Sequence, residues 1–170
     1  MIIGITGKSG SGKSTLAKKY VEKGYIHVNI DDIAHEVIEE NKYTIEAWLG
    51  TTDRKIIGQI LFNNREMYNE YCSVIWNVME KKIDRILKEN EKVVLDFILL
   101  PHTKYWNTCY RILCKCSDNL RKERVLKRDN ITEEGFNSRE KASINYDENS
   151  FDYIFENNDK ENIKKLVKVL

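Results

Sequence analysis

The 170-residue chain is poor in three features that mark particular protein classes. It has a single proline, Pro101, and no proline-rich or low-complexity tract of the kind that forms linkers. None of its four cysteines forms a C-x-x-C pair, which argues against a zinc site or a disulfide framework and favours a reducing compartment. No apolar run approaches membrane-spanning length, and the few residues before Gly7 are too short for a signal-peptide core. We therefore expect a soluble cytoplasmic protein that does not enter a membrane.

An excess of one charge is also lacking. Lysine and arginine total 28 against 27 acidic residues, for a formal net charge of +1, and neither half of the chain is a block of one sign. Nucleic-acid-binding domains usually carry a basic excess, so we expect small-molecule substrates and no nucleic acid. With 41% apolar residues, a chain of this length forms one domain with a sizeable core, as a monomer or small homo-oligomer.

The order of the predicted elements indicates the fold class. Short apolar runs alternate with longer segments of helical spacing, which is typical of an α/β protein with a parallel sheet covered on both faces. We expect strands at 2–6, 25–30, 92–97, 111–116 and 151–155. We expect helices at 13–23, 32–40, 53–62, 64–90 and 119–129, and a closing helix with an apolar stripe of Ile163, Leu166, Val167 and Leu170. The polar stretch around 130–140 reads as a mobile flap.

The stretch GITGKSGSGKST, residues 4–15, carries the clearest chemical signal. Residues 7–14 fit G-x-x-x-x-G-K-[ST] between a predicted strand and a predicted helix, which is the context that this pattern requires. Glycines let backbone N–H groups approach a phosphate, and the amino end of the helix adds unpaired donors and positive dipole. We expect ATP to be held here, with Lys13 at the β- and γ-phosphates and Ser14 as a ligand of Mg²⁺. The residues predicted to contact the phosphates are Gly7, Gly10, Ser11, Gly12, Lys13, Ser14 and Thr15.

Other nucleotide-binding classes fit less well. A GTPase would need a guanine-reading N-K-x-D, and NKYT at 41–44 lacks the aspartate. Motor and sensor ATPases usually have a strand that ends in paired acidic residues, whereas KVVLDF at 92–97 contains only Asp96. A small phosphotransferase with a basic lid remains.

The acceptor hydroxyl needs a carboxylate that orients or deprotonates it. Asp31 and Asp32 follow the second predicted strand at its carboxyl end, beside the phosphate loop in such a sheet. Either could instead cap the next helix. Because capping needs only one of them, we favour Asp31 as the catalytic residue.

A row of arginines supplies the candidate lid. Three of them are spaced i, i+3 and i+7 on one face of a predicted helix, where they suit the charge of a transferring phosphoryl group. The alternative is a solvated face paired with Glu123 and Asp129, and we favour that alternative for Arg121. The arginines of this region are Arg121, Arg124, Arg128 and, farther along, Arg139.

The chain resembles the dephospho-CoA kinase family nearly end to end. NIDDIAHEV (29–37) resembles the family's D-x-D-x-I-A-x-x-V, and VVLDFILL (93–100) resembles V-V-x-D-x-P-L-L. DRKIIGQILF (53–62) resembles an arginine, leucine-glycine and phenylalanine segment. ERVLKRDNITEEGFNSR (123–139) resembles the R-L-x-x-R-D lid entry and the helix after it, and FDYIFENN (151–158) resembles A-D-Y-V-I-x-N.

The resemblance implies transfer of the γ-phosphate of ATP to the ribose 3′-hydroxyl of dephospho-CoA. It also implies a three-layer P-loop kinase fold in one domain over 1–170: a central parallel five-stranded sheet, helices on both faces, a helical lid at roughly 128–142 and an acceptor-side helical region at roughly 32–90. Asp31 corresponds to the acceptor-activating aspartate and Arg128 to a lid arginine, with Arg124 and Arg139 also assigned to the lid. Arg54 matches the segment that shapes the acceptor pocket, and Asp96 matches an acidic residue near the metal or acceptor.

Most departures from the family pattern fall on the acceptor side. Asn29 stands at the first aspartate of D-x-D, Trp76-Asn77 at a histidine-proline, and Ile98 at a proline. His102 lies in a Pro-His pair at the usual aromatic-glutamate, Arg121 replaces a frequent glutamine, and only Arg139 remains of R-I-x-x-Q. Two other hypotheses therefore stay open: a small kinase of the same fold with another nucleoside or nucleotide acceptor, and a nucleotide-binding regulatory protein without transfer activity. Asp31 and the lid arginines weigh against the second of these.

Overall fold

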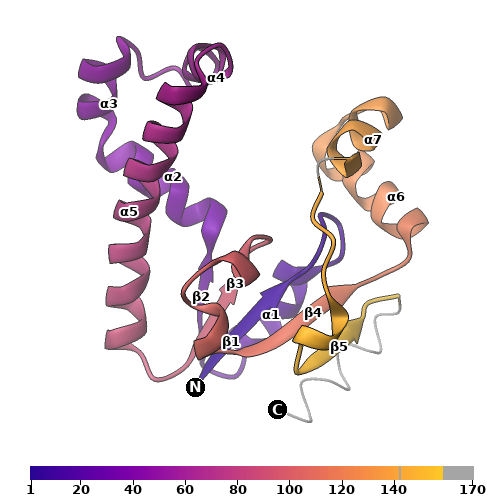
Figure 1. Cartoon of the computed structure of the whole chain (residues 1–170). Coiled ribbons are helices and arrows are strands. Elements are labelled where there is room, and N and C mark those ends of the chain that lie inside the picture. Colours follow the sequence, from indigo (N-terminus) through magenta and orange to yellow (C-terminus); the bar gives the residue numbers. More distant parts are fainter. Residues whose placement is uncertain (142, 159–170) are drawn as a thin grey trace. The chain divides into compact units, whose positions relative to one another are not determined.

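A computed structural model describes residues 1–141 and 143–158, without the side chains of residues 54, 55, 58 and 62 (Figure 1). The chain divides into two compact units, which we describe separately. Unit 1 comprises residues 1–29 and the chain from residue 90 onward, and unit 2 comprises residues 30–89. The predicted closing helix lies outside the described residues.

A five-stranded parallel sheet forms the centre of unit 1 (Figure 1). The strands are β1 (Ile2–Thr6), β2 (Ile26–Asn29), β3 (Val93–Asp96), β4 (Tyr110–Lys115) and β5 (Tyr153–Glu156). The strand order is β2-β3-β1-β4-β5, and each adjacent pair runs parallel. This arrangement confirms the predicted α/β class and the parallel sheet, with strand ends that differ from the prediction by at most two residues.

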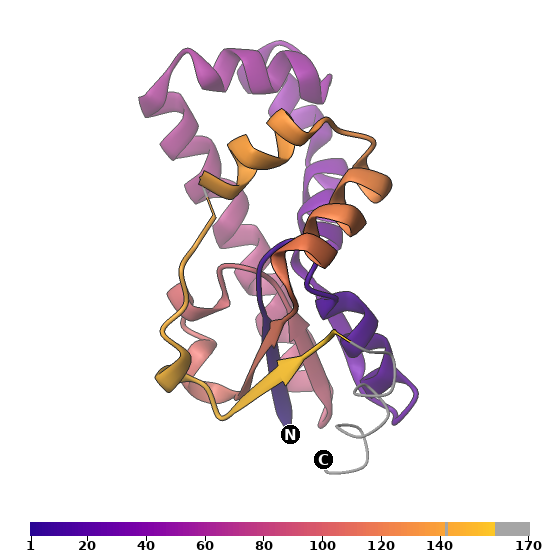
Figure 2. The same ribbon diagram turned by 90° about the vertical axis from the view of Figure 1, so that its right-hand side faces the viewer.

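The two faces of this sheet are covered in different ways. Helix α1 (Lys13–Val21) buries Leu16 and Tyr20 against Ile3 and Ile5 of β1. Because alternate residues of a strand point to opposite faces, Gly4 faces the other side, where a Cβ would lie 2.6 Å from Leu100 Cδ2. Two 3₁₀ turns, η1 (Leu100–His102) and η2 (Trp106–Thr108), lie on that second face (Figure 2).

Two helices follow β4 in unit 1, and the predicted lid of roughly 128–142 covers the end of the first and the whole of the second. Helix α6 (Asp118–Asp129) ends at Asn130, whose φ of 50° places it in the left-handed region. Helix α7 (Glu133–Lys141) occupies the stretch that reads as a flap, and it buries one aromatic ring, that of Phe136. A third 3₁₀ turn, η3 (Glu148–Ser150), leads into β5.

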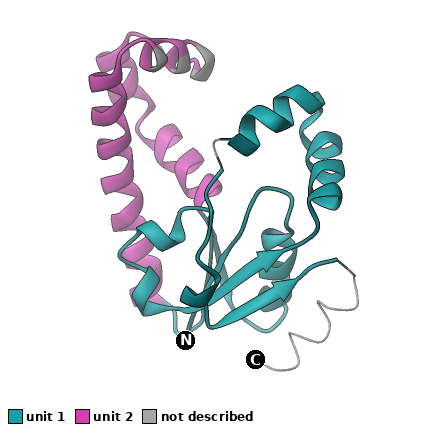
Figure 3. Ribbon diagram, turned by 45° about the vertical axis from the view of Figure 1, so that its right-hand side comes forward, with its two compact units in different colours: residues 1–29, 90–170 teal, residues 30–89 magenta. Residues whose placement is uncertain are grey.

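Unit 2 is helical (Figure 3). The helices are α2 (Ile30–Glu40), α3 (Lys42–Leu49), α4 (Arg54–Phe62) and α5 (Arg65–Glu89). Helix α3 was not predicted, because Ile45 is its one buried residue and no repeat of core positions marks it. Lys82 of α5 forms ion pairs with Glu36 and Glu40 of α2, at 2.7 and 2.8 Å. Across residues 1–141 and 143–158, no helix has the length and apolarity to cross a membrane.

An ion pair fixes the start of β5 to β4. Asp152 accepts hydrogen bonds from the Arg111 backbone N–H, Nε and Nη2, each at 2.8 Å. These bonds, led by those from the side chain, lower the pKa of Asp152 from 3.8 to about 2.

We expect Asp152→Asn to lower the melting temperature at neutral pH. A depressed pKa in the folded state stabilises the fold above the unfolded pKa, and this contribution is lost as the pH falls through the folded value. The difference in melting temperature between wild type and variant should therefore be largest above about pH 5 and should shrink as the pH falls toward 2. Calorimetric melting across this range measures it, and a difference that does not depend on pH would contradict the assignment.

Candidate active site

The loop between β1 and α1 can be formed only with glycine at three positions. Gly7, Gly10 and Gly12 have φ values of 147°, 81° and 100°, where other residues are strained. Space is also lacking, since a Cβ on Gly7 would lie 2.2 Å from the Cys114 carbonyl oxygen. The backbone therefore turns and approaches its neighbours as a phosphate-binding loop does.

The amino end of α1 completes a cradle for an anion. The helix begins at Lys13, its cap residue is a glycine without a side-chain cap, and its first turn holds no acidic residue. Unpaired N–H groups and the helix dipole both favour negative charge at such an end. The hydroxyl of Ser11 is buried and makes no hydrogen bond within the described part of the chain.

The predicted phosphate and metal contacts surround this cradle. Lys13 Nζ lies 3.4 Å from the Lys8 carbonyl oxygen, so its side chain folds back over the loop. Ser14 and Thr15 are exposed in the first turn of α1. A Ser14 hydroxyl at this position fits a magnesium ion that is bound mainly by phosphate oxygens and water.

The arginine row of α6 contacts the phosphate loop directly. Arg121 Nη1 donates to the Ser9 carbonyl at 3.1 Å, and Arg124 Nη1 donates to the Gly10 carbonyl at 3.3 Å. Arg128 Nη2 lies 3.1 Å from Ser9 Oγ. The spacing of three and seven residues therefore brings all three guanidinium groups to one loop.

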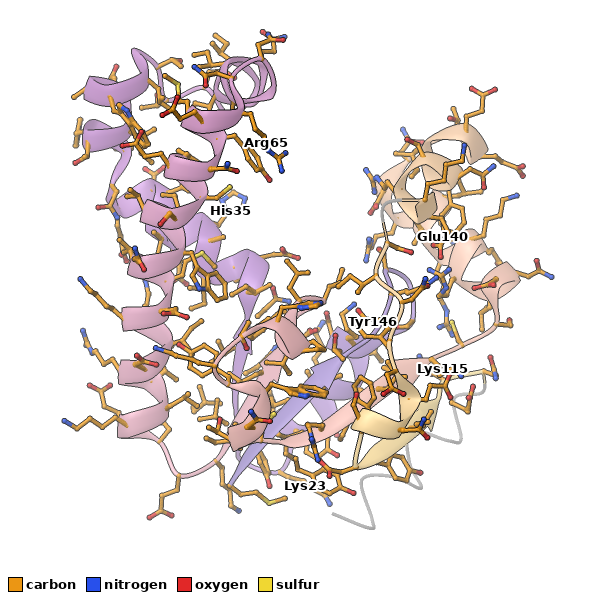
Figure 4. All side chains as sticks on the ribbon, viewed as in Figure 1. Lys23, His35, Arg65, Lys115, Glu140 and Tyr146 are labelled. Carbon is orange, nitrogen blue, oxygen red and sulfur yellow. The ribbon has the colours of Figure 1, made fainter. Side chains whose placement is uncertain are left out.

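The expectation that Arg121 lies on a solvated face is wrong. Its side chain is 4% exposed, because α6 packs against the loop and the Arg121 guanidinium also binds Glu140 of α7, at 2.8 Å. The other carboxylate oxygen of Glu140, a residue labelled in Figure 4, lies 2.5 Å from Lys8 Nζ. Burial acts to raise the pKa of Glu140, but the hydrogen bonds from Lys8 and Arg121 outweigh it and lower that pKa. This charged cluster ties the loop, α6 and α7 together.

Arg139 does not reach the loop in the same way. Its Nη1 pairs with Asp129 at 2.5 Å, and Arg128 Nε binds the same carboxylate at 2.6 Å. Hydrogen bonds from both arginines, that of Arg128 being the stronger, lower the pKa of Asp129. Arg128 and Arg139 are thus held close together at the junction of α6 and α7.

Asp96 ends β3 at the same edge of the sheet as the loop. It is 2% exposed, and its Oδ2 lies 3.3 Å from His27 Nε2 and 3.5 Å from Asn29 Nδ2, both on β2. The strand register pairs Asp96 with Asn29 on one side and with Ile5 of β1 on the other. Asn29, which departs from the family pattern, therefore contacts Asp96, the predicted acceptor-side carboxylate.

Three further acceptor-side residues belong to unit 2, namely Asp31, Arg54 and Trp76. Asp31 and Asp32 are exposed in the first turn of α2, where acidic residues also favour the helix dipole. The catalytic role of Asp31 thus stays a prediction. Arg54 begins α4, and its side chain lies outside the described part of the structure. Trp76 of α5 donates from Nε1 to Glu80 Oε1 at 2.9 Å.

Two residues at the loop were not selected from the sequence. Asn157, directly after β5, donates from Nδ2 to the Ser11 carbonyl at 2.7 Å. The Tyr146 hydroxyl donates to the Ile98 carbonyl at 3.1 Å and lines a cavity of about 260 Å³ beside Lys8 and Ser11. The available signal for Asn157 was its match to the asparagine that ends A-D-Y-V-I-x-N, whereas nothing local marks Tyr146.

Comparisons with known proteins agree on the kind of enzyme that this site resembles. The family model for dephospho-CoA kinase matches residues 1–162. The dephospho-CoA kinase of Prochlorococcus marinus is 30% identical over 94% of this chain and 89% of its own length. That of Fusobacterium nucleatum is 29% identical over 93% of this chain and 90% of its own length.

Solved structures share the fold. A dephospho-CoA kinase from Campylobacter jejuni superposes with a TM-score of 0.68 at 23% identity, covering 98% of this chain and 95% of that one. A shikimate kinase from Bacteroides thetaiotaomicron superposes with a TM-score of 0.55 at 14% identity, covering 99% and 95%. The P-loop kinase fold is therefore confirmed.

We expect Gly12→Ala to abolish ATP binding, because the added Cβ would lie 1.9 Å from Asn157 Nδ2 at a φ of 100°. Gly24→Ala is the matched control: its φ of 84° imposes a similar backbone strain, of about 1 kcal/mol, but among the described residues, its chain neighbours aside, no atom lies within 4 Å of its Cβ. Both variants should lose stability in thermal melting, Gly12→Ala more than Gly24→Ala because Asn157 must shift. ATP titration should separate them, and equal ATP affinities would show that the space at Gly12 is unimportant.

Proposed function

Because the chain belongs to the dephospho-CoA kinase family, we propose that it transfers the γ-phosphate of ATP to the ribose 3′-hydroxyl of dephospho-CoA, which gives CoA. The observation that carries the proposal is the phosphate loop. Its three left-handed glycines are followed by a helix whose first turn holds no acidic residue. The family match over residues 1–162 supports the acceptor.

The phosphates of ATP would lie in the cradle of residues 7–15. Backbone N–H groups of the loop and the amino end of α1 would bind the phosphate oxygens, and Lys13 would offset the charge of the β- and γ-phosphates. Ser14 would hold a magnesium ion, which when bound neutralises phosphate charge. The exposed Ser14 hydroxyl supports this assignment.

The lid, roughly 128–142, would carry Arg128 and Arg139 to the transferring group. Their shared contact with Asp129 supports a common position. Guanidinium groups suit the charge spread over the phosphoryl oxygens, and lid closure would exclude water that otherwise hydrolyses ATP. The transfer would be direct and in line, without a covalent enzyme intermediate.

On the acceptor side, Asp31 would orient or deprotonate the attacking hydroxyl, and Arg54 and Asp96 would bind the acceptor. We propose that the helical region of roughly 32–90 forms this side, and that it works with the loop and lid as one kinase domain over 1–170. The near-neutral charge supports small-molecule substrates without nucleic acid. The cysteines, none of which forms a C-x-x-C pair, support a place in the cytoplasm, and we propose a monomer or small homo-oligomer.

A coupled assay with ATP and Mg²⁺ tests the acceptor. We expect turnover with dephospho-CoA and much less with a panel of nucleosides and nucleotides. If only a nucleoside gave turnover, the proposed acceptor would be wrong and the kinase activity would stand.

Lys13→Ala should reduce kcat/KM by about 100-fold or more, because the charge on the phosphates is no longer offset. Undiminished activity would remove the phosphate loop from the mechanism.

The role of Asp31 is tested by Asp31→Asn beside Asp32→Asn. We expect the first to lower kcat by about 100-fold with little change in ATP affinity, because an amide cannot accept the proton of the hydroxyl. The second should leave kcat close to wild type and slightly reduce stability through the helix dipole. If the two variants behave alike, or if Asp31→Asn affects only melting, Asp31 is a helix cap.

A further inference from the structure

Three consecutive carbonyls of the phosphate loop, those of residues 9–11, accept hydrogen bonds from side chains outside the loop. The donors are Arg121 and Arg124 of α6 and Asn157 after β5, at 3.1, 3.3 and 2.7 Å. The bond from Asn157 is the shortest of the three and is buried. Outward carbonyls are what a loop needs when its N–H groups are to face a phosphate.

Asn157 is itself fixed on three sides. Its backbone N–H donates to the Lys115 carbonyl at 2.6 Å, which continues the ladder between β4 and β5. Its carbonyl accepts from Arg124 Nη2 at 3.3 Å, and the residue is 4% exposed. Since the Ser11 carbonyl can only accept, the amide nitrogen and not the amide oxygen must face it. A side chain held in this way cannot turn aside without breaking a buried hydrogen bond.

The position of Asn157 determines the direction of the next peptide. In a planar trans peptide the C=O of one residue and the N–H of the next point in opposite directions. A Ser11 carbonyl held outward by Asn157 therefore directs the Gly12 N–H inward. A Cβ on Gly12 would lie only 1.9 Å from Asn157 Nδ2. Asn157 can therefore occupy its position only because residue 12 is a glycine.

A second donor reaches the same carbonyl but is weaker. Cys114 Sγ lies 3.2 Å from the Ser11 carbonyl oxygen, and burial raises the pKa of this thiol to about 12. The thiol therefore stays protonated, but S–H is a poor donor. It would satisfy the Ser11 carbonyl only in part if the amide were removed.

We propose that Asn157 is a positioning residue for the phosphates of ATP. It directs the Gly12 N–H by holding the Ser11 carbonyl, and it does not touch the nucleotide itself. The inference rests on the proposed use of ATP. It concerns the ATP side of the reaction alone, so binding of dephospho-CoA should not depend on the Asn157 amide.

Asn157→Asp tests this, because it keeps the size of the side chain but places a carboxylate oxygen against the Ser11 carbonyl. Asn158→Asp is the matched control: it adds the same charge one residue later, and it retains the oxygen that accepts from the Ser117 N–H at 2.8 Å. Asn157→Leu removes the donor without adding charge, and provides a second measurement if the aspartate variant does not fold.

We expect Asn157→Asp to weaken ATP binding by more than about tenfold, measured by calorimetric titration without acceptor. The KM for ATP should rise by a similar factor. The KM for dephospho-CoA should stay near the wild-type value, and Asn158→Asp should match wild type throughout. Unchanged ATP binding in the Asn157 variants would overturn the inference. Equal changes in both KM values, with a lower melting temperature, would also overturn it by showing a structural role only. A wild-type protein that binds no ATP would instead reject the proposed function.

Discussion

The structure depends on the direction in which the peptides of one loop point. A phosphate can be bound by backbone N–H groups only if the intervening carbonyls face away and find other donors. Glycine makes the necessary turns possible, and side chains from α6 and from the end of β5 supply the donors. The parallel sheet makes this arrangement available, because the carboxyl ends of β1, β3, β4 and β5 lie at a common edge.

Charge is balanced over the whole chain but concentrated around this loop. Lys8 and Lys13 lie in the loop, and the arginines of α6 contact it. Glu140 offsets part of this positive charge through its ion pairs with Lys8 and Arg121. The cluster joins a loop near the amino terminus to a helix about 130 residues later. A net charge of +1 therefore says little about the field at the site.

The fold was predictable where local chemistry and burial agree. β1 is continuous and apolar, and its bounds were predicted without error. Helix α3 was missed because one buried position gives no amphipathic pattern. The stretch at 130–140 read as a flap because it is polar, and α7 nevertheless forms there with Phe136 packed under Arg121. Tertiary contact stabilises a helix for which the sequence gives weak evidence.

The sequence by itself determined the phosphate loop, the parallel α/β fold and the family, because each depends on residues that are close together or on a pattern that repeats along the chain. Only the tertiary structure decided that Arg121 is buried, that Glu140 binds Lys8 and that Asn157 holds the Ser11 carbonyl. These contacts join residues 19 to 146 positions apart, and which polar groups meet at such separations is decided by packing.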